Sequence, residues 1–210
     1  MASRALGRLR PSTTALFVCD VQEKFRPLIA GFPIVIDTAR RMVQAANVLD
    51  IPVMVTEQYP KALGSTVSEV ANVLPPACPV VAKTLFSMCT PDVDAWLKSK
   101  PDVRQDCTGP RPAQVMLLGI EAHVCVFQTS LDLLERGYEV HLLADGISSS
   151  RPHHRVAGLQ RLAQAGSFVS NSEMAMFQLM GDSKHPHFKE ISALVKEGQL
   201  VEAFQFTSAL

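Results

Sequence analysis

The sequence lacks three features that would place it in common classes of protein. It has no excess charge, because 20 lysine and arginine residues balance 20 aspartate and glutamate residues. Its longest apolar runs, such as VMLLGI at 115–120, fall far below the roughly 18 residues that a membrane-spanning helix needs. No Gly-rich phosphate loop follows any predicted strand. These absences argue against a nucleic-acid partner, a membrane partner and a flavodoxin-like cofactor domain.

Paired cysteines are also missing. The five cysteines, at positions 19, 78, 89, 107 and 125, are odd in number and form no CxxC motif. Free thiols in a reducing compartment explain this pattern better than a disulfide framework, so we expect a cytoplasmic protein. The first 11 residues carry three arginines and no acidic residue, which is typical of mitochondrial presequences and of disordered N-termini alike. We favour a flexible tail, and a mitochondrial location stays open.

Apolar and helical patterns alternate along the chain. Apolar, β-rich runs occur at 14–19, 52–56, 79–82, 114–119, 138–143 and 167–169. Helical patterns occur at 34–49, 65–73, 90–98, 123–136, 172–180 and 185–197. Strands that are apolar almost throughout indicate a parallel sheet covered on both faces. We therefore predict an α/β fold, a three-layer α-β-α, doubly wound (Rossmann-like) sheet of about six parallel strands.

The length of 210 residues allows one sizeable core and no second domain of ordinary size. We predict a single domain over residues 12–197, between a flexible N-terminal tail, 1–11, and a C-terminal tail, 198–210. Residues 99–113 are polar and contain proline, which predicts a surface loop.

Four reactive side chains follow the ends of predicted strands. Asp20 follows the first strand, Glu57 the second, Lys83 the third and Cys125 the fourth. Ligands of parallel sheets bind outside the carboxyl ends of the strands, so these side chains share the edge at which a site is expected. Each also has a plainer interpretation. Asp20 could cap a helix or face solvent, Lys83 could reach water, and Glu57 could pair with Lys83 or with solvent.

Cys125 carries the most information of the four. The segment GIEAHVC leads from a strand into a helix, where unpaired N–H groups and the helix dipole favour a reactive thiolate. Burial in the core is the alternative, and it is the interpretation that we favour for the other four cysteines. A thiolate, a carboxylate and a cation together make an acyl-transfer site, with backbone amides before Cys125 facing the oxyanion.

Three motifs resemble those of the isochorismatase-like hydrolases, a superfamily that includes nicotinamidases and carbamoyl-amide hydrolases. FVCDVQEKF (17–25) resembles the acid-bearing D-x-Q-x-x-F motif, VAKTLFS (81–87) the lysine segment, and GIEAHVCV (119–126) the nucleophile loop. The resemblance spans about residues 12–197. Within the superfamily, TEQYPKALG (56–64) and HPHFKEI (185–191) resemble the eukaryotic isochorismatase-domain-containing type.

The resemblance implies roles for particular residues. Asp20, Lys83 and Cys125 would form a catalytic triad, and the peptide bond between Ile120 and Glu121 would be cis. The amides of Glu121 and Cys125 would then form the oxyanion hole. The resemblance also implies a homo-oligomer, a dimer or a larger assembly.

Two departures from the superfamily refine this expectation. Nicotinamidases hold a metal with an aspartate and histidine cluster after the second strand, but TEQYPKALG contains no histidine. We therefore predict no catalytic metal and no cofactor. Enzymes that cleave isochorismate itself can lack the cysteine, so Cys125 favours amide or ester chemistry over vinyl-ether hydrolysis.

The sequence thus predicts a metal-independent cysteine hydrolase that cleaves an amide-type C–N bond, or a related acyl bond, in a small metabolite through a Cys125 thioester. Phe25, Gln58, Tyr59 and Phe86 follow strand ends and are the expected pocket walls, although aromatic residues there could equally be core. The alternative is a catalytically weak domain that binds a protein or a metabolite. Its terminal helices and C-terminal tail offer contact surface that the chemistry does not require.

Overall fold

The computed structural model describes residues 6–100 and 113–198 of the chain. These residues build a six-stranded, all-parallel sheet in the order β3-β2-β1-β4-β5-β6. The strands are β1 (Thr14–Cys19), β2 (Val53–Gln58), β3 (Val80–Lys83), β4 (Gln114–Ile120), β5 (Glu139–Ser148) and β6 (Phe168–Ser170). Each predicted apolar run overlaps one of them, and the predicted α/β fold is confirmed.

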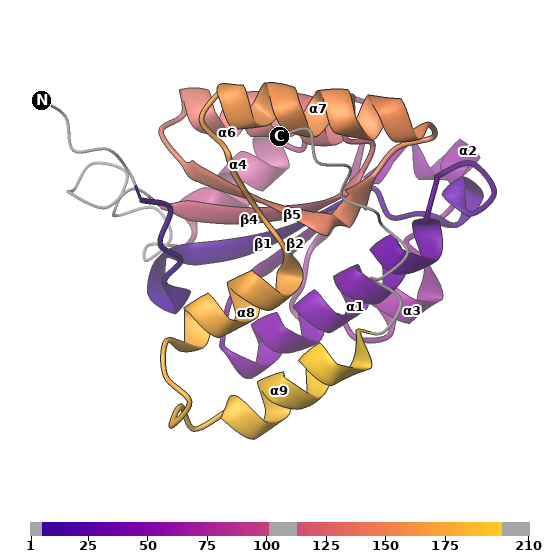
Figure 1. The fold of residues 1–210 in the computed structure, drawn as a ribbon. Coiled ribbons are helices and arrows are strands. Elements are labelled where there is room, and N and C mark those ends of the chain that lie inside the picture. Colours follow the sequence, from indigo (N-terminus) through magenta and orange to yellow (C-terminus); the bar gives the residue numbers. More distant parts are fainter. Residues whose placement is uncertain (1–5, 101–112, 199–210) are drawn as a thin grey trace, which may run out of the picture.

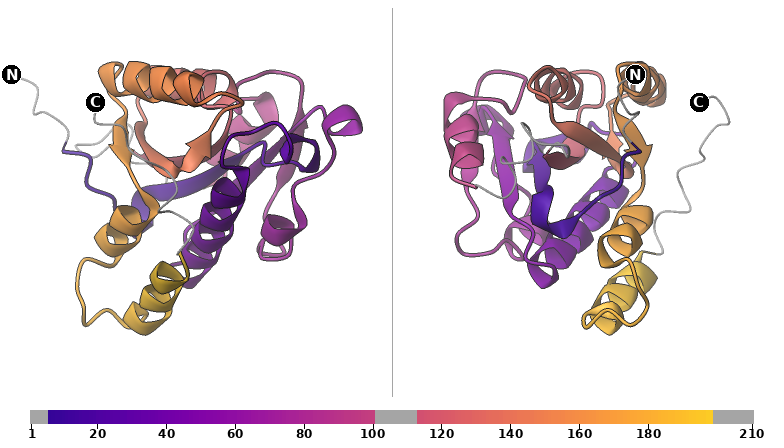
Figure 2. Two further views of the ribbon diagram at one scale, coloured as in Figure 1. Left: turned by 45° about the vertical axis from the view of Figure 1, so that its right-hand side comes forward. Right: turned by 90° about the vertical axis from the view of Figure 1, so that its left-hand side faces the viewer.

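Helices cover both faces of the sheet (Figure 1). One face carries α1 (Phe32–Val48), α8 (Ser172–Met180) and α9 (Phe188–Glu197). The other carries α4 (Pro91–Lys98), α6 (Cys125–Glu135) and α7 (Pro152–Gln164). The short helices are η1 (Pro11–Thr13), η2 (Glu23–Phe25), α2 (Pro60–Leu63) and α3 (Ser68–Ala71). Figure 2 shows the resulting three layers from two other sides.

The core lies on both sides of the two central strands. All residues of β1 and β4 are buried, which explains why these runs are apolar without alternation. On α1, Val35, Ala39, Met42 and Ala46 recur at helical spacing and are buried. The N-terminal segment joins this core as well, because Leu9 is buried and its amide donates to the side chain of Gln178.

The order of the strands creates a switch point between β1 and β4. From β1 the chain moves outward to β2 and β3, and it then returns to place β4 on the other side of β1. At such a point the connections leave in opposite directions and open a crevice at the carboxyl ends of the strands. Asp20 directly follows β1, and Cys125 begins α6 after the loop that follows β4, so both residues belong to this edge.

Some elements differ from the prediction. Strand β5 continues to Ser148, beyond the predicted end at 143. The additional part contains Asp145, which is buried and whose carboxylate accepts a hydrogen bond from the Ser172 amide at 2.8 Å. The apolar pattern cannot show such a buried, bonded acid. The helix predicted over 65–73 is reduced to Ser68–Ala71, and the last helix begins at Phe188. Most of the predicted loop 99–113, and all but one residue of the predicted C-terminal tail, lie outside the described residues.

In the two described ranges, no helix combines the length and the apolar composition needed to cross a bilayer.

Candidate active site

Two of the predicted site residues form an ion pair that is closed off from solvent. Nζ of Lys83, at the end of β3, lies 2.6 Å from Oδ2 of Asp20, which directly follows β1. The two side chains are 0% and 1% exposed. Because β2 lies between these strands, the long lysine side chain spans the carboxyl end of β2. Charges are kept in such a place only where an opposite charge and hydrogen bonds replace water.

The backbone and a neighbouring hydroxyl orient the Asp20 carboxylate. Asp20 has a φ of 55°, a left-handed conformation that aspartate, asparagine and glycine adopt most readily. Its amide donates to the Thr56 carbonyl at 3.2 Å, and Oγ1 of Thr56 donates to Oδ1 of Asp20 at 2.7 Å. One carboxylate oxygen is therefore held by Thr56 and the other by Lys83.

Lys83 stays protonated in this site. Burial by itself lowers the pKa of its ammonium group, but the charges of Cys19, Asp20 and Cys125, together with the hydrogen bond to Asp20, outweigh burial and raise the pKa. The cation in turn compensates the negative charge of a carboxylate or a thiolate beside it. The effect of Cys125 on the pKa of Lys83 indicates that the two side chains are close enough to interact electrostatically.

Cys125 is the first residue of α6 and is 7% exposed. The loop before it begins with a cis peptide bond between Ile120 and Glu121. The Glu121 carbonyl accepts hydrogen bonds from the amides of Val124 and Val126, which folds the loop into a tight turn. Within the part of the chain that the structure describes, the amides of Glu121 and Cys125 donate no hydrogen bond. Both N–H groups are thus available to a ligand oxygen.

Cys19 joins this cluster, although its residue type suggested only a core position. It is the last residue of β1, fully buried, and its Sγ donates to Oδ2 of Asp20 at 3.6 Å. Burial raises the pKa of the Cys19 thiol well above its usual range, and a hydrogen bond with Cys125 and the charge of Asp20 raise it further, while Lys83 lowers it. In the sequence, this position is indicated by Cys19 standing directly before Asp20 in the segment FVCD.

Gln22, the glutamine of the D-x-Q motif, has a structural role that the sequence did not assign. It is fully buried, and its Nε2 donates to the carbonyls of Gln58 and Gly64 at 3.0 and 2.6 Å. Its Oε1 accepts from the Gln58 amide at 2.7 Å. Gln22 therefore ties the segment after β1 to the end of β2, where the cation of Lys83 crosses.

The four predicted pocket residues differ in how much surface they offer. Tyr59 and Phe86 are 50% and 51% exposed beside the ends of β2 and β3. Phe25 is partly buried against the core. Both amide atoms of Gln58 are in use, because Oε1 accepts from Lys83 at 2.8 Å and Nε2 donates to the Thr84 carbonyl at 2.9 Å.

Glu57 does not join the ion pair. Its Oε1 accepts from the amide and the hydroxyl of Thr66, at 2.6 and 2.8 Å, so it fastens the loop after α2 to β2.

Three histidine rings lie close together beside the loop that precedes Cys125. The ring of His154 lies 4.2 Å from that of His123 and 4.3 Å from that of His153, and Nδ1 of His123 lies 3.1 Å from Oγ of Ser149. Across residues 6–100 and 113–198, no three His, Cys, Asp or Glu side chains gather in a way that could hold a metal ion.

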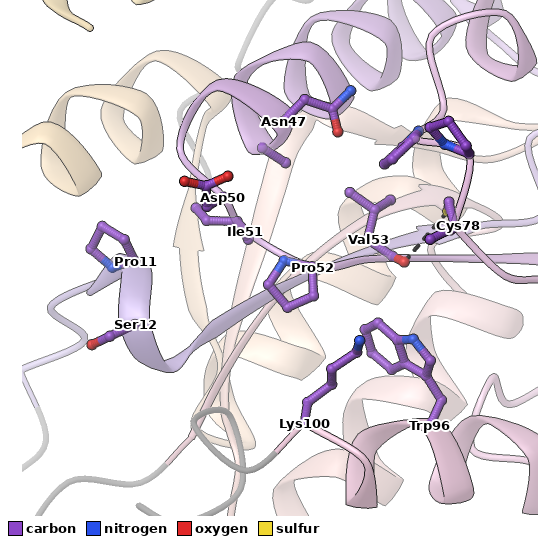
Figure 3. A pocket seen from close by; sticks show the side chains of 14 residues that line it. Pro11, Ser12, Asn47, Asp50, Ile51, Pro52, Val53, Cys78, Trp96 and Lys100 are labelled. Carbon is purple, nitrogen blue, oxygen red and sulfur yellow. Dashed lines mark hydrogen bonds between the residues drawn. The ribbon is translucent and has the colours of Figure 1, made fainter. Parts of the chain in front are cut away.

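A cavity of about 630 Å³ lies away from this chemistry (Figure 3). Its walls include Trp96, the amine of Lys100 over the Trp96 ring, and Pro52, which precedes β2. None of the three predicted catalytic residues lines it. Since Pro52 precedes β2 whereas Lys83 ends β3, the cavity and the ion pair lie at opposite ends of the sheet, and its volume alone does not mark the reactive site.

The chain is similar to known proteins over most of its length. A profile of the isochorismatase domain matches residues 14–174. The secreted isochorismatase effector Isc1 of Phytophthora sojae is 46% identical over 198 residues, which cover 93% of this chain and 90% of that protein. Isochorismatase domain-containing protein 2 of Homo sapiens is 46% identical over 196 residues, covering 93% and 89%. The structure of MAR1 ribonuclease from Caenorhabditis elegans superposes with a TM-score of 0.84 and 42% identity, covering 97% of both chains.

The family profile covers well over half of the chain, and the relatives exceed 40% identity across nearly all of it. The sheet order and the motifs on its carboxyl edge agree with this match. The chain belongs to the isochorismatase domain family of isochorismatase-like hydrolases.

Proposed function

We propose that this chain is a metal-independent cysteine hydrolase that cleaves an amide-type C–N bond, or a related acyl bond, in a small metabolite. One observation carries the proposal. A buried Lys83 cation lies 2.6 Å from the Asp20 carboxylate, and Cys125 opens α6 at the same carboxyl edge of the sheet. A carboxylate, a cation and a thiol at a switch point are the groups that nucleophilic acyl transfer uses.

The first half of the reaction forms a thioester. Asp20 accepts the proton of Cys125, and the thiolate attacks the carbonyl carbon of the substrate. The amides of Glu121 and Cys125 donate to the oxyanion of the tetrahedral intermediate. Asp20 then protonates the leaving nitrogen, the C–N bond breaks and the amine departs. Lys83 holds one oxygen of the Asp20 carboxylate in place, while Thr56 fixes the other.

The second half releases the acid. Asp20, again a carboxylate, takes a proton from a water molecule that attacks the thioester carbonyl. The intermediate collapses, the C–S bond breaks, and Cys125 takes the proton back from Asp20. Tyr59 and Phe86, both half exposed at the edge of the site, supply apolar surface for the non-reacting part of a substrate.

Thiol labelling tests the activation of Cys125 against a matched control. Cys89 is 7% exposed, as Cys125 is, but burial raises the pKa of Cys89 to about 11 and it has neither Asp20 nor Lys83 as a partner. We expect iodoacetamide to label Cys125 faster than Cys89 and the other three thiols, as measured by peptide mass spectrometry. Equal rates at both positions would contradict an activated thiolate, because access is equal.

Turnover is tested with Cys125→Ala and the control Cys89→Ala on a panel of small amides and carbamoyl compounds. Cys125→Ala should lose hydrolysis completely and keep the wild-type circular dichroism spectrum, whereas Cys89→Ala should keep its rate. An acyl adduct trapped on Cys125 would identify the substrate. If a folded, thiol-reactive protein gives no adduct from metabolite extracts, the alternative of a weakly active binding domain is favoured.

RNA is the competing substrate class, because the Caenorhabditis elegans relative is described as a ribonuclease. The reacting groups here are at most 7% exposed, and the chain has no net charge, so a bulky polyanion fits this site less well than a small molecule. Cleavage of RNA by the wild type that Cys125→Ala abolishes would overturn the preference for small substrates.

We further propose that the chain forms a homo-oligomer. The YcaC gene product of Escherichia coli, with a TM-score of 0.70 and 18% identity, is described as an octameric hydrolase. In this chain the edge strand β3 leaves Val80 45% exposed, and Leu85 beside it is 57% exposed. Light scattering after size-exclusion chromatography should give a mass of at least twice the 22.9 kDa of the chain. A monomer at micromolar concentration would disprove this.

A further inference from the structure

Cys19 lies on the same face of the sheet as the helix that begins with Cys125. Side chains alternate between faces along a strand, so Phe17 and Cys19 of β1 point the same way. Phe17 contacts Trp96 of α4, with ring centroids 6.2 Å apart, which identifies this as the face covered by α4 and α6. Cys125 opens α6 at the carboxyl edge, where β1 also ends with Cys19.

The register of the sheet places Cys19 beside the point where the chain leaves β4 toward Cys125. Cys19 pairs in register with Gly119 of β4, and a Cβ on Gly119 would lie only 2.1 Å from the Cys19 carbonyl oxygen. The strands therefore pack in close contact where the chain leaves β4 for the nucleophile loop. Cys125 lies close enough to Cys19 to help raise the pKa of the Cys19 thiol. Hydrolysis as proposed above uses Cys125 and leaves Cys19 without a role.

We propose that Cys19 is a resolving thiol, which captures a peroxide-oxidised Cys125 as an intramolecular Cys19–Cys125 disulfide. The proposal shares the reactive Cys125 with the hydrolase but does not depend on hydrolysis. The disulfide blocks the nucleophile reversibly and protects it from irreversible oxidation.

The first step oxidises Cys125. Cys125 is 7% exposed and Cys19 is 0% exposed, so a small peroxide meets the Cys125 sulfur first. The thiolate attacks one oxygen of hydrogen peroxide, the S–O bond forms, and the O–O bond breaks. Sulfur loses two electrons to the peroxide, which leaves as hydroxide and takes a proton from solvent. The product is a Cys125 sulfenic acid.

The second step closes the disulfide. Oδ2 of Asp20 lies 3.6 Å from Sγ of Cys19 and accepts its proton as the sulfur attacks. The Cys19 sulfur attacks the Cys125 sulfur, the S–S bond forms and the S–O bond breaks. The departing hydroxide takes the proton from Asp20 and leaves as water. Asp20 thus serves as the base for both reactions of the site.

The other two described thiols are internal controls. Burial raises the pKa of Cys78 and of Cys89 to about 11 each. Cys78 donates to the carbonyls of Val53 and Pro79 and has no carboxylate hydrogen bond like that of Cys19. Neither thiol hydrogen-bonds to another cysteine within the described residues.

Peroxide treatment followed by peptide mapping tests the proposal without any substrate. In the wild type we expect a cross-linked Cys19–Cys125 peptide that lacks two hydrogen atoms, and full recovery of Cys125 labelling after dithiothreitol. In Cys19→Ala, Cys125 should proceed to sulfinic and sulfonic acids, and dithiothreitol should restore no labelling. Cys78→Ala should behave as the wild type.

Several outcomes would overturn the proposal. These are wild-type protein in which Cys125 goes directly to sulfinic acid, a disulfide that joins Cys125 to another cysteine, and a Cys19→Ala variant that dithiothreitol restores as fully as the wild type. Cys19→Ser, which keeps the shape of the side chain, should match Cys19→Ala if resolution is chemical. Because hydrolysis is not measured, a protein without hydrolase activity could still pass this test, and an active hydrolase could fail it.

Discussion

At the residue scale, the ion pair of Asp20 and Lys83 affects both the stability of the protein and its proposed chemistry. The two side chains are closed off from solvent, and each supplies the other with the opposite charge that burial demands. Removing one partner leaves an uncompensated charge in the interior, which costs about 3–5 kcal/mol, whereas removing both leaves none. The stability effect of a single substitution therefore exceeds the net contribution of the pair.

A double-mutant cycle separates the two effects. Lys83→Met and Asp20→Asn should each lower the free energy of unfolding by about 3–5 kcal/mol. The double variant should be more stable than the sum of the single changes predicts, with a coupling energy of about 1–3 kcal/mol. All three should lack hydrolase activity. Urea denaturation measures the stabilities, and additive losses would show that the charges do not compensate each other.

At the element scale, α7 packs directly against the loop before Cys125, and Gly158 is the residue at the contact. A Cβ on Gly158 would lie 2.5 Å from the carbonyl oxygen of Ala122, a backbone atom that cannot rotate away. The helix and the loop therefore approach as closely as their main chains allow. Because Ala122 follows Glu121 directly, this contact holds the chain next to the Glu121 amide that is proposed to bind the oxyanion.

The variant Gly158→Ala tests this contact. We expect it to push the loop from its position, to lower the free energy of unfolding by about 1–3 kcal/mol and to reduce kcat more than it raises KM. Arg161→Ala, on the exposed side of the same helix, should stay within about 0.5 kcal/mol of the wild type and keep its kcat. Unchanged kinetics in Gly158→Ala would mean that the loop holds its geometry without α7.

The elements show where sequence reasoning succeeds and fails. The strands were predictable because central parallel strands are buried on both faces, and the common edge of Asp20, Lys83 and Cys125 was predictable because parallel strands end at one edge. Thr56, Gln22 and Cys19 were not assigned a role, since each acts through a partner that only the fold brings close. Thr56, for example, meets Asp20 from a strand 36 residues away. The end of β5 was missed because a bonded, buried Asp145 reads as a surface acid.

At the scale of the whole molecule, His141 makes the free energy of unfolding depend on pH. It is 2% exposed on β5 and stacks on Phe168, and its Nε2 has no hydrogen-bond partner among the described residues. Oε2 of Glu139, 4.0 Å away, is the nearest carboxylate. Burial lowers the pKa of His141 to about 4, against about 6.5 in an unfolded chain. Between these values the unfolded chain binds a proton that the folded chain does not.

Stability is therefore complete above pH 6.5 and falls as the pH drops toward about 4, by about 3 kcal/mol for this one group. In His141→Phe, which preserves the stacking, this part of the pH dependence should vanish. His153→Gln, on an exposed histidine, should retain the wild-type slope. Urea unfolding across this range measures the slopes. Identical slopes in His141→Phe and the wild type would show that other groups govern acid sensitivity.

The left-handed backbone of Asp20 has a consequence for inherited variation. Its φ of 55° is easily adopted by aspartate, asparagine and glycine but strained for bulkier residues. Asparagine and glycine avoid that backbone strain but still leave the buried Lys83 cation without its carboxylate partner, so every substitution there should reduce the amount of folded protein in the cell. Inherited changes at this position should therefore act through loss of folded protein as well as through loss of the proposed chemistry.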